Sequence, residues 1–147
     1  MCGMKQDNFD ELLRRSGLKN TKTRSAILEI LEKSEQPVTA EQVFLELKNK
    51  QISANLSTVY RTLETLAEKM LAKKLNISGD SRAMFEYNRL VHRHYLVCLE
   101  CKKIIPIDFC PIKNYEKTLE EKTKFKIAGH KLDVYGYCPD CQNKIQE

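Results

Sequence analysis

The chain has 147 residues, of which 41% are hydrophobic and 31% are charged. These proportions are ordinary for a soluble protein of one or two small domains, and without an apolar run near roughly 18 residues a membrane span is excluded. The net charge of +5 divides into 15 basic against 12 acidic side chains in residues 1–89 and 10 against 8 in residues 90–147. Charge therefore permits a nucleic-acid partner without requiring one. The first residues lack the apolar stretch of a signal peptide, which predicts a cytoplasmic protein.

Three amphipathic helices are predicted in the first part of the chain. Apolar residues recur at helical spacing in residues 8–17, 21–34 and 39–50. Gly17 is typical of the C-terminal end of a helix, and Thr39 is a good N-cap. The side chains expected in the core are Ile27, Leu28, Leu31, Val43, Phe44 and Leu47.

A fourth predicted helix, residues 55–70, has one apolar and one polar face. Its apolar stripe comprises Val59, Leu63, Leu66 and Met70. The opposite face and its flanks comprise Ser57, Thr58, Tyr60, Arg61, Glu64 and Thr65. Residues 71–88 then read as two strands around a turn at 78–80. Helices followed by such a hairpin have the order of a winged helix-turn-helix domain.

The polar face of the fourth helix is a candidate DNA-binding surface. Hydroxyl groups and arginine suit phosphates and base edges, and a tyrosine ring can contact a thymine methyl group. Basic residues around the start of the second helix can contact backbone phosphates. The candidate DNA-binding residues are Lys19, Lys22, Arg24, Ser57, Thr58, Tyr60 and Arg61. A polar helix face is usually only solvated, but its position before a wing favours DNA.

The second part of the chain predicts a small α+β domain beginning near residues 88–91. β-Branched and aromatic residues predict strands within residues 92–101, 102–109 and 126–138. Residues 111–124 predict a helix with Pro111 in its first turn. The fold class is therefore α+β, with a helical winged domain followed by a smaller mixed domain.

Four of the six cysteines form two C-x-x-C pairs, which favour a structural zinc site. The candidate ligands are Cys98, Cys101, Cys138 and Cys141. Zinc takes four ligands in a tetrahedron, and each pair supplies two thiolates. The alternative, a thioredoxin-like redox pair, needs one C-x-x-C at the start of a helix, whereas these pairs are matched and lie in strand-like sequence. With all four positions filled by protein, such a site does not catalyse.

The three histidines are candidates for a second, regulatory metal site. His92 and His94 are two residues apart, so on a strand they point to the same face, and His130 is the remaining histidine. Possible fourth ligands are Cys110, Asp108 and Glu116. Three imidazoles with a thiolate or carboxylate suit zinc, whereas iron or manganese prefers more oxygen. The alternative is that the histidines are solvated and Cys110 is a small buried apolar residue.

These motifs together resemble the ferric-uptake-regulator family of metal-responsive repressors. The resemblance rests on LSTVYRTLETL, on H-R-H-Y-L-V-C-x-x-C and on AGHKLDVYGYCPDC, and it covers about residues 9–142. It implies a winged-helix DNA-binding domain in residues 1–89 and a dimerisation and metal-binding domain in residues 90–147. It also implies that the four paired cysteines hold structural zinc and that Tyr60 and Arg61 lie in the recognition helix, with Lys19 and Arg24 approaching DNA.

The chain departs from this family at the usual sensory metal site. Arg93 and Tyr95 stand where two sensory histidines usually lie, Gln36 replaces a histidine of the DNA-binding domain, and Pro106 replaces a carboxylate. Glu86 is the hinge ligand that remains. The loss of these histidines disfavours the peroxide-sensing branch.

A second family site matches His92, His94 and His130. It usually adds a carboxylate from the intervening helix, but Lys113 lies near that position, so Glu116, Asp108 or Cys110 would have to substitute. The sequence looks most like the zinc-uptake branch. It predicts a homodimeric repressor that binds an inverted-repeat operator in double-stranded DNA when zinc, or less favourably iron or manganese, occupies the regulatory site.

Several other functions are open. An iron-responsive or atypical member of the same family is the alternative within the resemblance. From other classes, a structural zinc module that binds protein or RNA is possible, and a zinc enzyme is disfavoured. The chain lacks the H-x-E of zinc deaminases and the H-E-x-x-H of metalloproteases. We therefore predict no enzymatic activity, no small-molecule substrate and no membrane partner.

Overall fold

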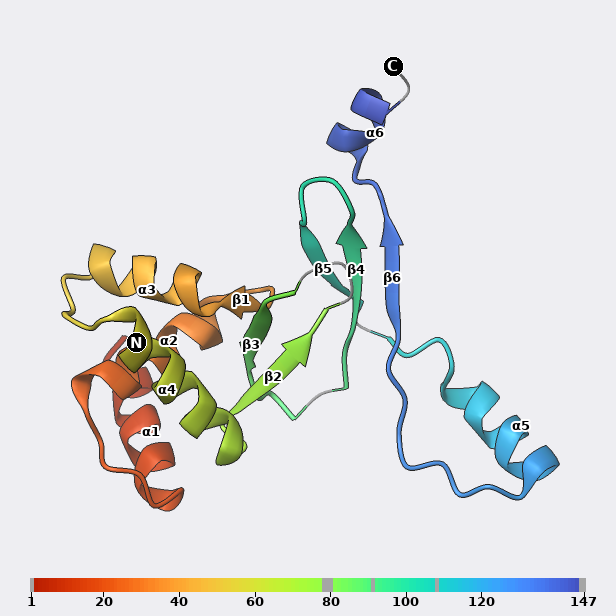
Figure 1. Ribbon diagram of the computed structural model, residues 1–147. Coiled ribbons are helices and arrows are strands. Elements are labelled where there is room, and N and C mark those ends of the chain that lie inside the picture. Colours follow the sequence, from red (N-terminus) through yellow and green to blue (C-terminus); the bar gives the residue numbers. More distant parts are fainter. Residues whose placement is uncertain (1, 78–80, 91, 108, 146–147) are drawn as a thin grey trace. The chain divides into compact units, whose positions relative to one another are not determined.

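The computed structural model describes residues 2–77, 81–90, 92–107 and 109–145, and side chains from Asn8 to Lys144 within those ranges. The predicted turn at 78–80 and the candidate ligand Asp108 lie outside the described residues. The chain divides into two compact units, Met1–Arg89 and Leu90–Glu147. The predicted α+β class is confirmed, with a helical unit followed by a smaller mixed one (Figure 1). Among the described residues, no helix is long and apolar enough to cross a bilayer.

The first unit packs four helices against a small antiparallel sheet. Its helices are α1 (Cys2–Arg15), α2 (Lys22–Lys33), α3 (Ala40–Asn49) and α4 (Leu56–Glu68). Its strands are β1 (Val38–Thr39), β2 (Ala72–Asn76) and β3 (Ala83–Tyr87), in the order β1-β3-β2. The hairpin after α4 forms the wing of a winged helix. The two-residue strand β1 was not predicted, because its length gives no alternation in the sequence.

Local signals set the helix boundaries in the first unit. The Thr21 and Asn55 side chains cap α2 and α4 by accepting hydrogen bonds from the backbone N–H groups of Arg24 and Thr58. Thr39 and Gln42 form a reciprocal capping box at the start of α3. Gly17 adopts a positive φ of 77° after α1, as expected for a residue that ends a helix. Helix α1 begins earlier than the predicted residue 8.

The core of the first unit follows the apolar periodicity closely. Ile27, Leu28, Leu31, Val43, Leu47, Val59, Leu63 and Leu66 are all buried in one cluster with Phe9, Leu13 and Phe85. Phe44 is only partly buried. The prediction for Met70 was wrong, since its side chain is 71% exposed. Helix α4 ends at Glu68, and a φ of 65° at Met70 turns the chain away before its side chain can join the apolar stripe.

The second unit is built on a mixed three-stranded sheet. Its strands are β4 (His94–Cys98), β5 (Ile104–Ile107) and β6 (Asp133–Gly136), and its helices are α5 (Lys113–Thr123) and α6 (Pro139–Ile145). Central β4 pairs antiparallel with β5 and parallel with β6. Pro111 precedes α5 instead of lying in its first turn, and Ile112 is the N-cap. Helix α6 was not predicted, because its seven residues overlap the second C-x-x-C pair.

Candidate metal centres

The first candidate metal centre, the four-cysteine cluster, consists of the two C-x-x-C pairs. Cys98 ends β4, Cys101 lies in the turn that follows, Cys138 follows β6 and Cys141 lies on α6. Their sulfur atoms all lie within 4.8 Å of one another. The Cys138 backbone N–H donates to Cys98 Sγ at 3.3 Å, and Lys102, with a φ of 64°, tightens the turn after Cys101. The predicted convergence of the two pairs is therefore present.

Electrostatics in the four-cysteine cluster favour a bound cation. Hydrogen bonds from the backbone N–H groups of Cys138 and Cys101 lower the pKa of Cys98 to about 6. The Cys141 pKa is instead raised to about 12, first by its hydrogen bond with Cys138 and then by burial and the other two thiols. Four adjacent thiolates repel one another, so all four ionise together only around a metal ion. A tetrathiolate set with C-x-x-C turns fits zinc.

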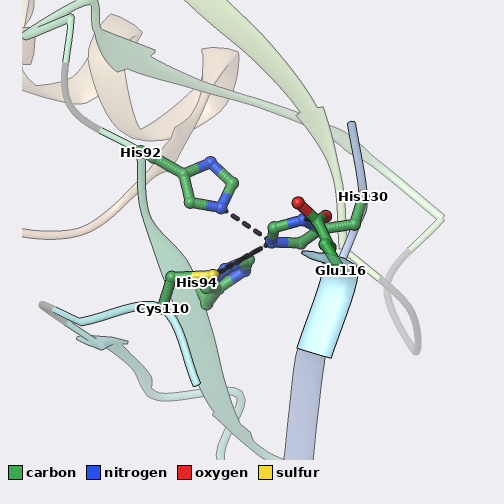
Figure 2. A network of polar contacts seen from close by, with 5 residues as sticks. All are labelled: His92, His94, Cys110, Glu116 and His130. Atoms are coloured by element: carbon green, nitrogen blue, oxygen red, sulfur yellow. Dashed lines mark hydrogen bonds and ion pairs between the residues drawn. The ribbon is translucent and has the colours of Figure 1, made fainter. Parts of the chain in front are cut away.

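A second group of donors, the histidine-cysteine cluster, brings together His92, His94, His130 and Cys110 (Figure 2). The His130 Nε2 atom lies 2.8 Å from His92 Nε2, 3.0 Å from His94 Nε2 and 3.3 Å from Cys110 Sγ. His94 Nε2 and Cys110 Sγ are also 3.3 Å apart. A ring nitrogen carries one proton or one lone pair, so His130 Nε2 cannot hydrogen-bond to all three neighbours. Four donor atoms that face one another in this way fit a shared cation.

The dimensions of the histidine-cysteine cluster match tetrahedral zinc. Bond lengths of about 2.0 Å to nitrogen and 2.3 Å to sulfur place two nitrogens about 3.3 Å apart, and a nitrogen and a sulfur about 3.5 Å apart. The four separations given above, 2.8 to 3.3 Å, are slightly shorter than these values, and all of the donor atoms lie within 4.8 Å of one another. His94 is only 2% exposed, and burial, followed by the neighbouring His92 and His130, lowers its pKa. Its imidazole therefore favours the neutral form that binds metal.

The predicted positions of the cluster residues need two corrections. His92 lies before β4, which begins at His94, so the two histidines do not lie on one strand, although their ring centroids are 4.4 Å apart. Glu116 does not join the ligand atoms: its carboxylate contacts His130 Nδ1 from α5, which directs Nε2 towards the cluster (Figure 2). Such carboxylate partners orient metal-binding histidines. Cys110 is half-buried with its sulfur in the cluster.

Glu86, the hinge ligand that the resemblance leaves, is not part of a metal-ligand cluster. Among the described residues, the groups of three or more potential ligands are the four-cysteine and histidine-cysteine clusters alone. Glu86 is buried on β3 and belongs to neither. Tyr95 is buried on β4, pairing with Pro106, and Gln36 is exposed.

Three of the seven candidate DNA-binding residues, Arg24, Thr58 and Arg61, line one recess of the first unit. Arg24, Thr58, Arg61, Thr62 and Thr65 line a shallow recess of about 200 Å³, which joins α2 to the polar face of α4. Lys19, Lys22 and Ser57 are also exposed.

Tyr60 is already engaged within the unit. Its hydroxyl group donates to Glu41 Oε1 on α3 at 3.0 Å, and this bond raises the Tyr60 pKa. The pKa of Glu41 is lowered, first by its backbone N–H at the start of α3 and then, against desolvation, by Tyr60 and Arg82. The sequence alone does not indicate this role of Glu41, because an acidic residue in the first turn of a helix is also common without any partner.

A winged-helix unit and a unit with two thiolate and imidazole clusters define a metal-binding regulator of transcription. Residues 15–135 match the "Ferric uptake regulator family", and the chain belongs to this family. It is 36% identical over 144 residues to the ferric uptake regulation protein of Bacillus subtilis, covering 96% of this chain and 97% of that protein. It is 30% identical over 133 residues to the peroxide-responsive repressor PerR of Staphylococcus aureus, covering 90% of this chain and 88% of that protein.

The fold is similar to that of the Helicobacter pylori ferric uptake regulator. The TM-score is 0.80 at 25% identity, over 97% of this chain and 94% of that chain, and that structure is described as having three functional metal binding sites. Members of this family are metal-responsive transcription regulators and not enzymes.

Proposed function

We propose that this protein is a cytoplasmic, homodimeric repressor that binds an inverted-repeat operator in duplex DNA when zinc fills the histidine-cysteine cluster, and that it controls zinc-uptake genes. The observation that carries the proposal is the convergence of His92, His94, His130 and Cys110. The four-cysteine cluster would hold a permanent structural zinc ion, and the histidine-cysteine cluster an exchangeable one. A bound ion would join segments that are far apart in the sequence.

Zinc is preferred over iron or manganese because of the donor set. Three imidazole nitrogens and one thiolate complete a tetrahedron without oxygen. Iron(II) and manganese(II) favour higher coordination with more oxygen ligands, and the nearby carboxylate of Glu116 is committed to His130. An iron-responsive regulator is the second candidate, favoured by the names of relatives such as the B. subtilis ferric uptake regulation protein.

A second copy of the chain would cover apolar surface that the second unit leaves exposed. Leu96, Ile105 and Val134 are paired in register across the three strands, so they lie on one sheet face. They are 39%, 44% and 42% exposed. Helix α5 has no buried residue. Contiguous apolar surface of this kind marks an interface, and a two-fold dimer would present two winged helices to two half-sites.

The DNA contacts are assigned to the surface around the recess. Arg24 and Arg61, with Lys19 and Lys22, supply charge for backbone phosphates, and Ser57 and Thr58 at the start of α4 supply hydroxyl groups for phosphates or bases. The Tyr60 ring would contact bases while its hydroxyl group is held by Glu41. The metal would bind more tightly to the dimer arrangement that fits DNA than to other arrangements, and it would therefore shift the dimer towards that arrangement.

The test is DNA binding under controlled metal. The probe is a duplex selected from a random library by the zinc-treated protein. Zinc should tighten binding relative to chelator and do so at a lower free concentration than iron(II) or manganese(II). His94→Ala should abolish the zinc response, whereas Arg61→Ala should weaken binding with or without zinc. Tight binding that ignores every metal would refute the proposed sensing.

A further inference from the structure

The two metal clusters occupy opposite ends of the same three strands. His94 begins β4 and Cys98 ends it. Cys101 precedes β5 and Cys110 follows it, while His130 precedes β6 and Cys138 follows it. Because β4 runs antiparallel to β5 and parallel to β6, the start of β4 lies beside the end of β5 and the start of β6. Each strand therefore connects one cluster to the other, across roughly 13 Å between His94 and Cys98.

Within one copy of the chain, few side chains are buried against these strands. Among the described residues of the second unit, the buried apolar side chains other than cysteine are Tyr95, Val97 and Ile104. The buried core cluster of the protein lies in the first unit. A sheet of three short strands with so few buried side chains has little stability of its own. Metal bound at the two clusters therefore adds substantially to the pairing of these strands within one copy of the chain.

We propose that the two metal centres are positively coupled through the sheet, so that metal in the histidine-cysteine cluster tightens metal binding in the four-cysteine cluster and the converse. This inference rests on the proposed function. Metal at one end fixes the pairing and register of all three strands, and the ordering entropy is then already lost when the second metal binds. The ligands at the far end are thereby brought closer to their binding geometry.

The charges of the two centres act in the same direction. Four thiolates around a divalent ion leave a net negative centre, whereas one thiolate and three neutral imidazoles leave a net positive one. Opposite charges on one small sheet attract. Coupling of this kind is typically 5- to 150-fold, and it is reciprocal for equilibrium affinities. The structural zinc would thus set the free zinc concentration at which the histidine-cysteine cluster fills.

The experiment measures exchange of zinc in the four-cysteine cluster with isotopically enriched zinc. Free zinc is buffered either below or above the level that fills the histidine-cysteine cluster, and mass spectrometry follows the exchange in the full-length protein. In the wild type, filling the histidine-cysteine cluster should slow exchange at the four-cysteine cluster, because its ligands are held closer to their binding geometry. His130→Ala should show no slowing, and Lys131→Ala, at the exposed neighbouring position, should behave like the wild type.

Two results separate this inference from the proposed function. If the histidine-cysteine cluster binds zinc but neither the exchange rate at the four-cysteine cluster nor the affinity in the reciprocal measurement below changes, the coupling is refuted and the sensing site stands. If no second, exchangeable zinc binds at any concentration, the proposed function itself fails.

A reciprocal measurement uses Cys101→Ser, at the exposed position of the four-cysteine cluster. This variant should bind zinc roughly 5- to 150-fold more weakly at the histidine-cysteine cluster, with its fold checked by circular dichroism. Unchanged affinity in a folded variant would contradict the coupling.

Discussion

Replacing Glu116 with alanine tests whether this carboxylate orients His130 without binding the metal itself. The Glu116 carboxylate contacts His130 Nδ1, and the two side chains are 24% and 16% exposed. A half-buried hydrogen bond to a charged group contributes about 1.5 to 3 kcal/mol. Loss of such a partner of a metal-binding histidine typically lowers affinity about 10- to 100-fold, or about 1.4 to 2.8 kcal/mol. Because the two estimates agree, we expect zinc affinity at the histidine-cysteine cluster to fall about 10- to 100-fold.

The assay is a zinc titration against a chromophoric competitor, with the four-cysteine cluster already filled. Helix α5 has no buried residue, so Glu116→Ala should leave the fold intact. Glu121→Ala, at an exposed position of the same helix, is the matched control and should retain wild-type affinity. Glu116→Gln should fall between the two, because its amide oxygen still accepts from Nδ1–H. Unchanged affinity in Glu116→Ala, or an equal loss in Glu121→Ala, would refute the orienting role.

Three further predictions concern DNA binding, stability and pH. Arg61→Ala should weaken binding to all duplexes and reduce by about 1 the slope of log affinity against log salt concentration, whereas Glu64→Ala should not weaken binding. Equal slopes in the wild type and both variants would show that Arg61 makes no phosphate contact. Leu63→Ala should cost about 2 to 5 kcal/mol in urea unfolding because Leu63 is fully buried, while exposed Met70→Ala should cost below about 0.5 kcal/mol; similar losses would contradict the corrected end of α4. In chelator, the second unit should lose stability as pH falls below about 6.5. The pKa of His94 is lowered in the folded protein, so as the pH falls the unfolded chain binds a proton at this residue before the folded chain does. If His94→Gln leaves the dependence of stability on pH unchanged, this explanation is wrong.

The sequence was sufficient where a pattern reflects one local cause. Apolar spacing located the core residues of α2 to α4, and Thr39 marked the start of α3 through its side chain. The C-x-x-C spacing also placed the two cysteines of each pair close together, because residues three apart can lie on one turn.

Other features depend on contacts between distant residues, which spacing does not encode. The carboxylate of Glu116 contacts His130 only because α5 and the segment before β6 meet in space. The same applies to Glu41 and Tyr60 on separate helices. Met70 was misplaced because apolar periodicity continues past Glu68, where the backbone leaves the helix.

The most direct test of the account is the zinc content of purified protein after dialysis at a buffered free zinc level that fills the histidine-cysteine cluster. The account predicts two zinc ions per chain in the wild type, one of which a mild chelator removes. His94→Ala and Cys110→Ala should each hold one, whereas Phe109→Ala, at an exposed position beside Cys110, should hold two. If both cluster variants keep the full exchangeable complement, the assignment of the histidine-cysteine cluster as a metal site is wrong.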